Sequence, residues 1–260
     1  MRLVLGVSHY RPEVEAAQVE RLVDLGAQGV VVAPTTHDRS PEELAAWLRS
    51  VPVPVVVAER RVGGLTALSE LDQVRTDHAH GAVLAVEHLA GLGHRRVGLA
   101  VDDRTPTAPH VREGFAAALA RLGVAGGPDV SLPAPEGDPA GLGRALAAFL
   151  DRCRQTGTRA VLVHTDDHAA RLVEAALDRG LRVPEDLAVV AYDDENAGLA
   201  VVPLTAVTPP RRELGREALR LLVARVVGED VEEPGASGAP RYVALLPRLT
   251  VRGSCGAGTS

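Results

Sequence analysis

The sequence predicts an α/β fold built on parallel strands, and three observations lead to this prediction. Short runs of Val, Leu and Ala alternate with longer segments whose apolar residues recur at helical spacing. Several of the helical segments end in a glycine just before the next strand, where a helix commonly closes in a left-handed conformation. Repeated units of this kind favour parallel sheets covered by helices.

The expected strands are four or five residues long and follow one another along the whole chain: Leu3–Val7, Val30–Ala33, Val55–Ala58, Val97–Val101, Ala160–Val163 and Leu187–Ala191. Amphipathic helices are expected around three apolar sets: Ala82, Val86, Leu89 and Ala90; Ala169, Leu172, Val173 and Ala176; Leu214, Ala218, Leu221 and Leu222. The closing glycines are Gly26, Gly93, Gly123, Gly157 and Gly180. The segment 231–240 is expected to be an exposed loop before a last hydrophobic stretch, Tyr242–Val251.

Composition excludes several classes of protein. The 260 residues carry 28 basic and 34 acidic side chains, which gives a formal net charge of −6. A net negative charge disfavours binding to the phosphate backbone of a nucleic acid. Aromatic residues make up only 2%, which argues against a platform that stacks single-stranded bases. No apolar run approaches the roughly 18 residues of a membrane span. Two cysteines form no disulfide framework and fit a reducing compartment, so a cytoplasmic location is expected.

The familiar catalytic and nucleotide-binding motifs do not occur. No G-x-G-x-x-G follows a strand, and there is no G-x-x-x-x-G-K-[ST] loop and no G-x-S-x-G elbow. Carboxylates are abundant, but their positions pair none of them into a general acid and base. The sequence therefore predicts neither catalytic residues nor a cofactor.

Polar clusters follow the expected strands, and ligands bind at this end of open parallel sheets. The clusters are "VSHY", "VAPTTHD", "VAERR", "VDDRT", "VHTDDH" and "AYDDENAG". In "HTDDH" a metal site competes with a helix cap provided by Asp166 or Asp167, and the cap is favoured. A cap at Asp77 is likewise favoured in "TDHAHG". The adjacent pair Asp102–Asp103 is interpreted as part of a solvated loop rather than a Mg²⁺ site.

Three stretches together resemble one family. They are "EHLAGLGHRRVGLA" (87–100), "ALDRGLRVPEDLAVVAYDD" (176–194) and "PLTAVTPPRRELGREALRLL" (203–222), the last supported by the closing "LLPRLTVRGSC". This set resembles the effector-binding and dimerisation region of lactose/galactose-repressor-type (LacI/GalR) transcription regulators. The resemblance implies two Rossmann-like lobes of the type I periplasmic-binding-protein kind, a homodimer, and a small sugar-like or polyol effector bound between the lobes.

The resemblance also implies which residues contact the effector. Asp193 matches the first aspartate of the family's Asp-Asp pair, which holds ligand hydroxyls, and Asp194 is expected only to cap the short helix that follows. Glu59 stands where the family has an aspartate, and Thr165 where it has an asparagine. Thr76 lies at the first crossing between lobes, and Tyr10 follows the first expected strand. The family's ligand arginine falls on a proline here, so Arg112 is the nearest substitute.

The implied domain boundaries place residues 1–75 and 208–237 in an N-lobe and residues 76–207 and 238–254 in a C-lobe, with 255–260 as a disordered tail. The chain crosses between lobes near Thr76, at Val207–Pro209 and near Gly238. The first strand and helix of the family's N-lobe have no counterpart, and neither does the helix-turn-helix headpiece that binds operator DNA. We therefore expect the chain to be a fragment or the product of an internal start, and to reach DNA only through a headpiece outside it.

The function predicted from the sequence is the sensing half of a transcription regulator that is not an enzyme and has no membrane partner. A solute-binding protein of a sugar transporter is the first alternative. A metal-dependent hydrolase that uses "HTDDH" is the second.

Overall fold

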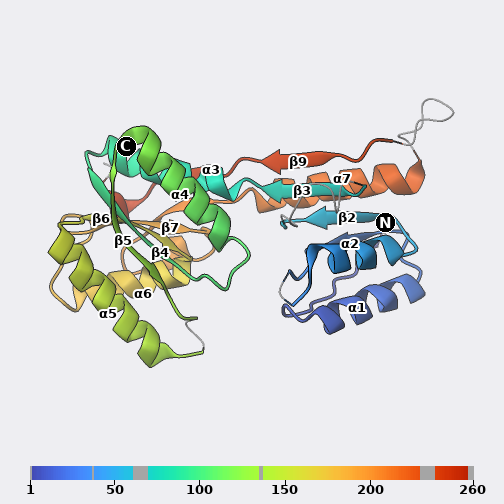
Figure 1. Cartoon of the computed structure of the whole chain (residues 1–260), viewed down its shortest axis with the longest axis horizontal. Coiled ribbons are helices and arrows are strands. Elements are labelled where there is room, and N and C mark those ends of the chain that lie inside the picture. The colour runs from blue at the N-terminus through green and yellow to red at the C-terminus, as the bar shows by residue number, and fades with distance from the viewer. Residues whose placement is uncertain (1, 37, 61–69, 135–136, 229–237, 257–260) are drawn as a thin grey trace. The chain divides into compact units, whose positions relative to one another are not determined.

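The computed structural model describes residues 2–36, 38–60, 70–134, 137–228 and 238–256 (Figure 1). The chain divides into two compact units. We call Met1–Thr76 with Pro210–Leu245 the N-terminal unit, and Asp77–Pro209 with Leu246–Ser260 the C-terminal unit. Each is an α/β unit with its own sheet, which confirms the predicted fold class.

The N-terminal unit has a four-stranded sheet in the order β1-β2-β3-β9, and all neighbouring strands run parallel. Its elements are α1 (Pro12–Asp24), β1 (Val30–Val32), α2 (Pro41–Ser50), β2 (Val55–Ala58), β3 (Asp72–Thr76), α7 (Arg211–Val227) and β9 (Tyr242–Leu245). Alternate side chains of β2 face opposite ways, so Val55 and Val57 pack with α1 and α2 while Val56 and Ala58 pack with α7. Helices thus cover both faces of the sheet.

The C-terminal unit has a six-stranded sheet in the order β10-β8-β7-β6-β4-β5. All of its pairs are parallel except that of β10 with β8. Its elements are α3 (His78–Gly91), β4 (Arg96–Val101), α4 (Ala108–Leu122), β5 (Ala125–Ser131), α5 (Pro139–Thr156), β6 (Ala160–His164), α6 (Asp166–Leu177), β7 (Ala188–Tyr192), η1 (Ala197–Leu199), β8 (Thr205–Thr208), β10 (Arg248–Thr250) and η2 (Gly253–Cys255).

The central strands of this unit are buried on both faces, which explains their unbroken apolar runs. On β6, Val161 and Val163 pack in a cluster with α5 and α6, whereas Ala160 and Leu162 pack in another with α3 and α4. Figure 1 shows these two helix pairs in the C-terminal unit. Because β4, β6 and β7 are parallel neighbours, their carboxyl ends lie at one edge of the sheet.

The prediction of a strand at Leu3–Val7 is wrong. These residues lie outside any strand, and their large side chains are exposed, Leu5 to 88%. In the described residues β1 pairs only with β2 and is an edge strand, with Val31 half-exposed. The apolar run 3–7 does not pair with the open side of β1, so its side chains are not buried against the sheet.

The third chain crossing also differs from the expectation. The structure places the first two crossings after Thr76 and Pro209, but the third after Leu245 rather than near Gly238. The cause is β9, which pairs in parallel with β3 over the whole of Tyr242–Leu245 and so belongs to the N-terminal unit. The expected tail is wrong at its start, since Cys255 is buried at 2% exposure and contacts His88.

Candidate functional site

Three predicted site residues come together in the N-terminal unit. Glu59 directly follows β2, and its carboxylate accepts hydrogen bonds from the Thr76 hydroxyl at 2.8 Å and from the Thr76 backbone N–H at 3.3 Å. Thr76 ends the neighbouring strand β3 and is buried. The guanidinium of Arg60, which donates to the Glu59 carbonyl, lies 6.0 Å from the ring centre of Tyr10. Tyr10 itself is 60% exposed, so the cluster combines an acceptor, a cation and an open aromatic face.

Two of these residues share an uncommon backbone conformation with Asp193. Tyr10 has φ 58°, Glu59 has φ 56° and Asp193 has φ 96°, all in the left-handed region that side chains other than glycine seldom occupy. Such residues cost free energy and concentrate at binding and catalytic sites, where the surrounding structure holds them. In each case the residue follows a strand or, for Tyr10, the apolar run that the sequence predicts as one.

Asp193 lies in the C-terminal unit directly after β7. Its backbone N–H donates to the carbonyl of Val207 at 3.0 Å, which extends the pairing of β7 with β8 by one bond. The side chain of the next residue, Asp194, is 7% exposed and forms an ion pair with Arg252 at 2.7 Å. Its other carboxylate oxygen accepts from the Thr208 hydroxyl, also at 2.7 Å. Asp194 therefore anchors the loop and does not cap the short helix, so the sequence interpretation of Asp194 is wrong.

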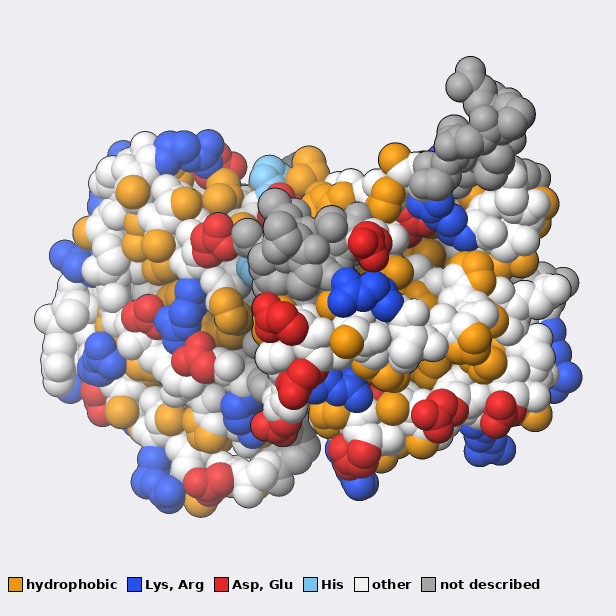
Figure 2. Space-filling view, turned by 45° about the vertical axis from the view of Figure 1, so that its right-hand side comes forward, with side chains coloured by type: hydrophobic (Ala, Val, Ile, Leu, Met, Phe, Trp, Pro, Cys, Tyr) orange, Lys and Arg blue, Asp and Glu red, His pale blue; other side chains and the backbone are white. Residues whose placement is uncertain are grey.

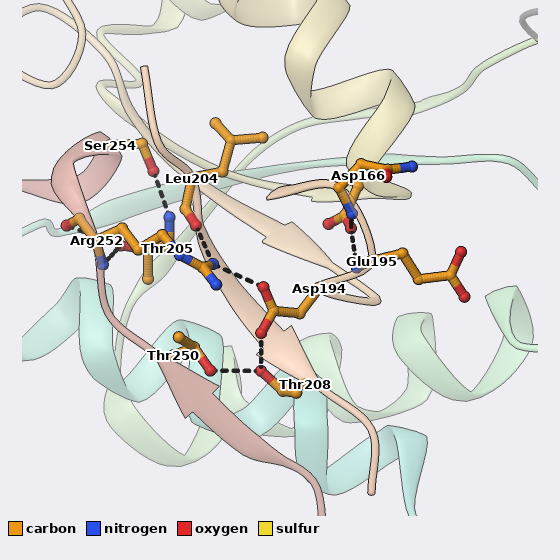
Figure 3. A network of polar contacts seen from close by, with 10 residues as sticks. Asp166, Asp194, Glu195, Leu204, Thr205, Thr208, Thr250, Arg252 and Ser254 are labelled. Carbon is orange, nitrogen blue, oxygen red and sulfur yellow. Dashed lines mark hydrogen bonds and ion pairs between the residues drawn. The ribbon is translucent and has the colours of Figure 1, made fainter. Parts of the chain in front are cut away.

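Figure 3 shows how far this anchoring network extends. Arg252 also donates to the Leu204 carbonyl at 2.7 Å, and its own backbone N–H donates to the Thr205 hydroxyl at 2.8 Å. Ser254 accepts from the backbone N–H of Thr205 at 2.9 Å. The residues after β10 are thus tied to β8, and through Asp194 to the loop that carries Asp193.

A second carboxylate holds the same loop from the opposite side. One oxygen of Asp166 accepts from the backbone N–H groups of Glu195 at 2.6 Å and Asn196 at 3.1 Å. The helix α6 begins after Thr165, so Asp166 is not its N-cap as the sequence suggested. Burial raises the pKa of Asp166 although these N–H groups favour its charged form. Held at both Asp194 and Glu195, the loop fixes the backbone position of Asp193 before any ligand arrives.

Thr165 follows β6, the strand next to β7, and is thus at the same edge of the sheet as Asp193. Its backbone N–H lies 3.4 Å from Nδ1 of His168, whose Nε2 lies 2.9 Å from the Pro133 carbonyl. The preceding His164 is buried, and burial, with the nearby His78 and His168, lowers its pKa to about 3. His164 is therefore neutral at physiological pH. Among the described residues, no group of three His, Cys, Asp or Glu side chains is arranged to hold a metal ion.

Arg112 has a different environment from the other predicted site residues. It lies on α4, and its guanidinium binds Asp103 through two hydrogen bonds, at 2.8 and 3.0 Å, and also binds Asp129. These carboxylates raise the pKa of Arg112 well above its usual value.

Asp102, next to Asp103, is buried and bound by Arg104 rather than solvated. The Asp77 cap is confirmed, because its side chain accepts from the His80 N–H at 3.0 Å.

The surface charge agrees with the composition. On the face shown in Figure 2, acidic and basic side chains are interspersed, and the described residues there form no continuous basic surface. None of the described helices is long and apolar enough to cross a membrane.

Comparison with curated proteins finds transcription regulators. The chain is 32% identical over 248 residues to an uncharacterised HTH-type transcriptional regulator in the aml 5′ region of Streptomyces limosus, covering 91% of this chain and 65% of the relative. It is 34% identical over 164 residues to the HTH-type transcriptional repressor CytR of Escherichia coli, covering 62% of this chain and 47% of the relative. The chain thus spans about half to two thirds of these relatives. Both relatives are named as HTH-type transcription regulators, in agreement with the sequence prediction.

Solved structures show the same fold. A complex of the transcriptional regulator CelR with cellobiose aligns with a TM-score of 0.72 and 26% identity over 93% of this chain and 70% of its own. A LacI family regulator from Enterococcus faecium aligns with a TM-score of 0.74 at 23% identity, over 97% and 86% of the two chains.

Both comparisons confirm the resemblance to the effector-binding region of LacI-type regulators. Residues 86–255 match the periplasmic binding protein-like domain, and they include the whole loop that carries Asp193. This chain therefore belongs to the family of periplasmic binding protein-like domains.

Proposed function

We propose that this chain is the ligand-sensing and dimerisation domain of a LacI/GalR-type transcription regulator, and that its effector is a small sugar-like or polyol molecule. The relatives are named as HTH-type regulators, and the structural neighbour at 26% identity holds cellobiose. Operator DNA is contacted through another part of the regulator, because the −6 charge and mixed surface of this chain do not suit it to DNA.

The observation that carries the proposal is the conformation of Asp193. Asp193 has φ 96°, and the two residues that follow it, Asp194 and Glu195, are both anchored, so its backbone is held in a strained conformation of the kind that concentrates at binding sites. An ionised carboxylate accepts two or more donors, and adjacent hydroxyls of a sugar supply them in a matching geometry. In the N-terminal unit Glu59 offers the same chemistry, with Thr76 and Tyr10 beside it.

Signalling then follows from population shift. The effector favours one conformation of a homodimer over another, and operator binding changes in proportion to that preference. A difference of about 1–3 kcal/mol in effector affinity between the two conformations changes operator affinity by about 5- to 150-fold.

A thermal-shift screen of the purified chain against sugars, polyols, nucleosides and divalent metals tests the proposal. A ligand that binds only the folded state raises the melting temperature by mass action. We expect a saturable rise with one sugar-like compound. A rise with a divalent metal alone would move the function to the metal-dependent hydrolase, and a cooperative melt that no compound shifts would contradict effector binding.

A further inference from the structure

A basic pocket lies in the C-terminal unit at the sheet edge opposite Asp193. It has a volume of about 600 Å³ and is lined by His94, Arg95, Arg96 and Arg159 together with apolar and glycine residues. Arg96 begins β4, and Arg159 directly precedes β6. Because β4, β6 and β7 are parallel, these side chains are at the amino end of the strands, whereas Asp193 follows their carboxyl end.

The three arginines of this pocket have no acidic partner within ion-pair distance among the described residues. Arg96 donates to the Gly126 carbonyl at 2.8 Å and Arg159 to the Glu185 carbonyl at 2.5 Å, and both acceptors are neutral backbone groups. Five other arginines of the same unit, Arg104, Arg112, Arg121, Arg182 and Arg252, each pair with a carboxylate. What distinguishes Arg95, Arg96 and Arg159 is that they line one pocket together. Asp186 is close enough to Arg159 for the charge of that arginine to help lower the pKa of Asp186, but Asp186 forms its ion pair with Arg182. Three guanidinium groups that line one pocket without an ion-paired carboxylate favour the binding of an anion there.

Helix ends alone do not account for these cations. α3 and α5 both end here, at Gly91 and Thr156, and the two C-termini together carry about one negative charge. One carbonyl near the end of each helix already has a partner, since those of Leu89 and Cys153 accept from the backbone N–H groups of His94 and Thr158. Three guanidinium groups exceed the helix charge by about two.

Each guanidinium has five N–H donors in a planar fork that matches phosphate oxygens. Arg96 and Arg159 each donate from one guanidinium nitrogen to a backbone carbonyl, which orients the guanidinium group and leaves its other N–H donors for a ligand. His94 is half-buried, and its pKa is lowered by burial and by the charge of Arg159, so it adds a neutral donor beside the cations. The volume of 600 Å³ is in the range of small-molecule sites and exceeds the needs of a single inorganic ion.

We propose that the pocket lined by Arg95, Arg96 and Arg159 binds a small phosphate-bearing molecule with at least two negative charges. This second site is independent of the sugar-like effector and of Asp193, because it belongs to the opposite edge of the sheet.

Isothermal titration calorimetry of the 260-residue chain with inorganic pyrophosphate, at constant ionic strength, tests this proposal. Sodium sulfate at equal ionic strength serves as the general-anion reference. We expect saturable one-site binding of pyrophosphate that R95A and R159A each weaken at least tenfold. R171A is the matched control, because Arg171 is an exposed arginine of the same unit that does not line the pocket.

The outcomes separate clearly. Equal binding in R95A, R159A and R171A would overturn the proposal, since pyrophosphate would then respond only to overall charge. Absence of saturable binding in the wild-type chain would also overturn it. Asp193→Asn should leave pyrophosphate binding unchanged, and a loss in that variant would contradict the separation of the two sites.

Discussion

The contact between α3 and α4 gives the sharpest test of the packing in the C-terminal unit. Gly114 lies in the middle of α4, and a Cβ atom built on it would come within 2.6 Å of the Ala79 carbonyl carbon and 2.7 Å of its Cα. Both atoms belong to the backbone of α3, so no side-chain rotation relieves the clash. Gly114→Ala must therefore move one helix relative to the other.

The size of the effect follows from two opposing terms. Overpacking a well-packed core costs about 1–3 kcal/mol, and a clash with backbone belongs at or above the upper end of that range. Replacing glycine by alanine inside a helix returns up to about 1 kcal/mol. The net expectation is a destabilisation of about 2 kcal/mol or more. Gly143, inside α5, is the matched control because a Cβ there meets nothing within 4 Å.

Urea unfolding followed by circular dichroism measures both variants. Gly143→Ala should raise the free energy of unfolding by about 0.5–1 kcal/mol, and Gly114→Ala should lower it by about 2 kcal/mol, with similar m-values. The same chemical change thus has opposite signs at the two positions. If Gly114→Ala were as stabilising as Gly143→Ala, the close approach of α3 and α4 would be refuted.

Three further predictions concern buried charge. The folded-state pKa of His164 is lowered to about 3, so below pH 6.5 only the unfolded chain gains its proton. The free energy of unfolding should then fall by about 1.4 kcal/mol for each unit by which the pH decreases below 6.5. In His164→Gln, the free energy of unfolding measured in urea should depend less on pH between pH 6.5 and 5 than in the wild type. Asp194→Ala should destabilise the chain by about 2–3 kcal/mol, because Arg252 at 26% exposure loses its partner, and a urea midpoint equal to wild type would contradict the anchoring role. Burial disfavours the charged Asp72 carboxylate, but the ion pair with Arg225 outweighs burial and lowers the pKa of Asp72. The stability that this carboxylate contributes is therefore present above about pH 4 and is lost as the pH falls through the folded-state pKa. Asp72→Asn should therefore be less stable than wild type at pH 7 and should show a weaker pH dependence below pH 4 in thermal melts.

Hydrophobic pattern was sufficient to predict the central strands. Five of the six expected strands are found within one residue at each end, because strands buried on both faces need continuous apolar runs. Strands β3, β5, β8, β9 and β10 were not predicted as strands, although β9 and β10 lie within the expected hydrophobic stretch Tyr242–Val251. The sequence of β3, "DQVRT", places a buried Asp72 in the sheet through its ion pair with Arg225, and β5, "AGGPDVS", is a sheet edge rich in Gly and Pro. Neither has the composition of a typical strand.

The candidate site was only partly accessible from the sequence. The strand-end position of Asp193 and Glu59 follows from the alternation of elements, and the family resemblance selects them among many carboxylates. The roles of Asp166 and Asp194 depend on partners about 30 and 58 residues away, Glu195 and Arg252, which local spacing cannot reveal. The strand prediction for Leu3–Val7 is wrong for the same reason, since a strand needs a neighbouring strand and the apolar pattern of one segment does not show whether it has one.

The effector-binding role of Asp193 is tested most directly by calorimetric titration of the sugar-like compound found in the thermal-shift screen. Asp193→Asn keeps the size of the side chain and tolerates the left-handed backbone, so it removes only the charge. Asp167→Asn is the control, because Asp167 is exposed on the neighbouring α6. We expect at least a tenfold weaker affinity in Asp193→Asn, about 1.4 kcal/mol, with the melting transition still cooperative and the affinity of Asp167→Asn unchanged. Equal affinity in all three proteins would contradict this expectation and would make Asp193 a structural residue.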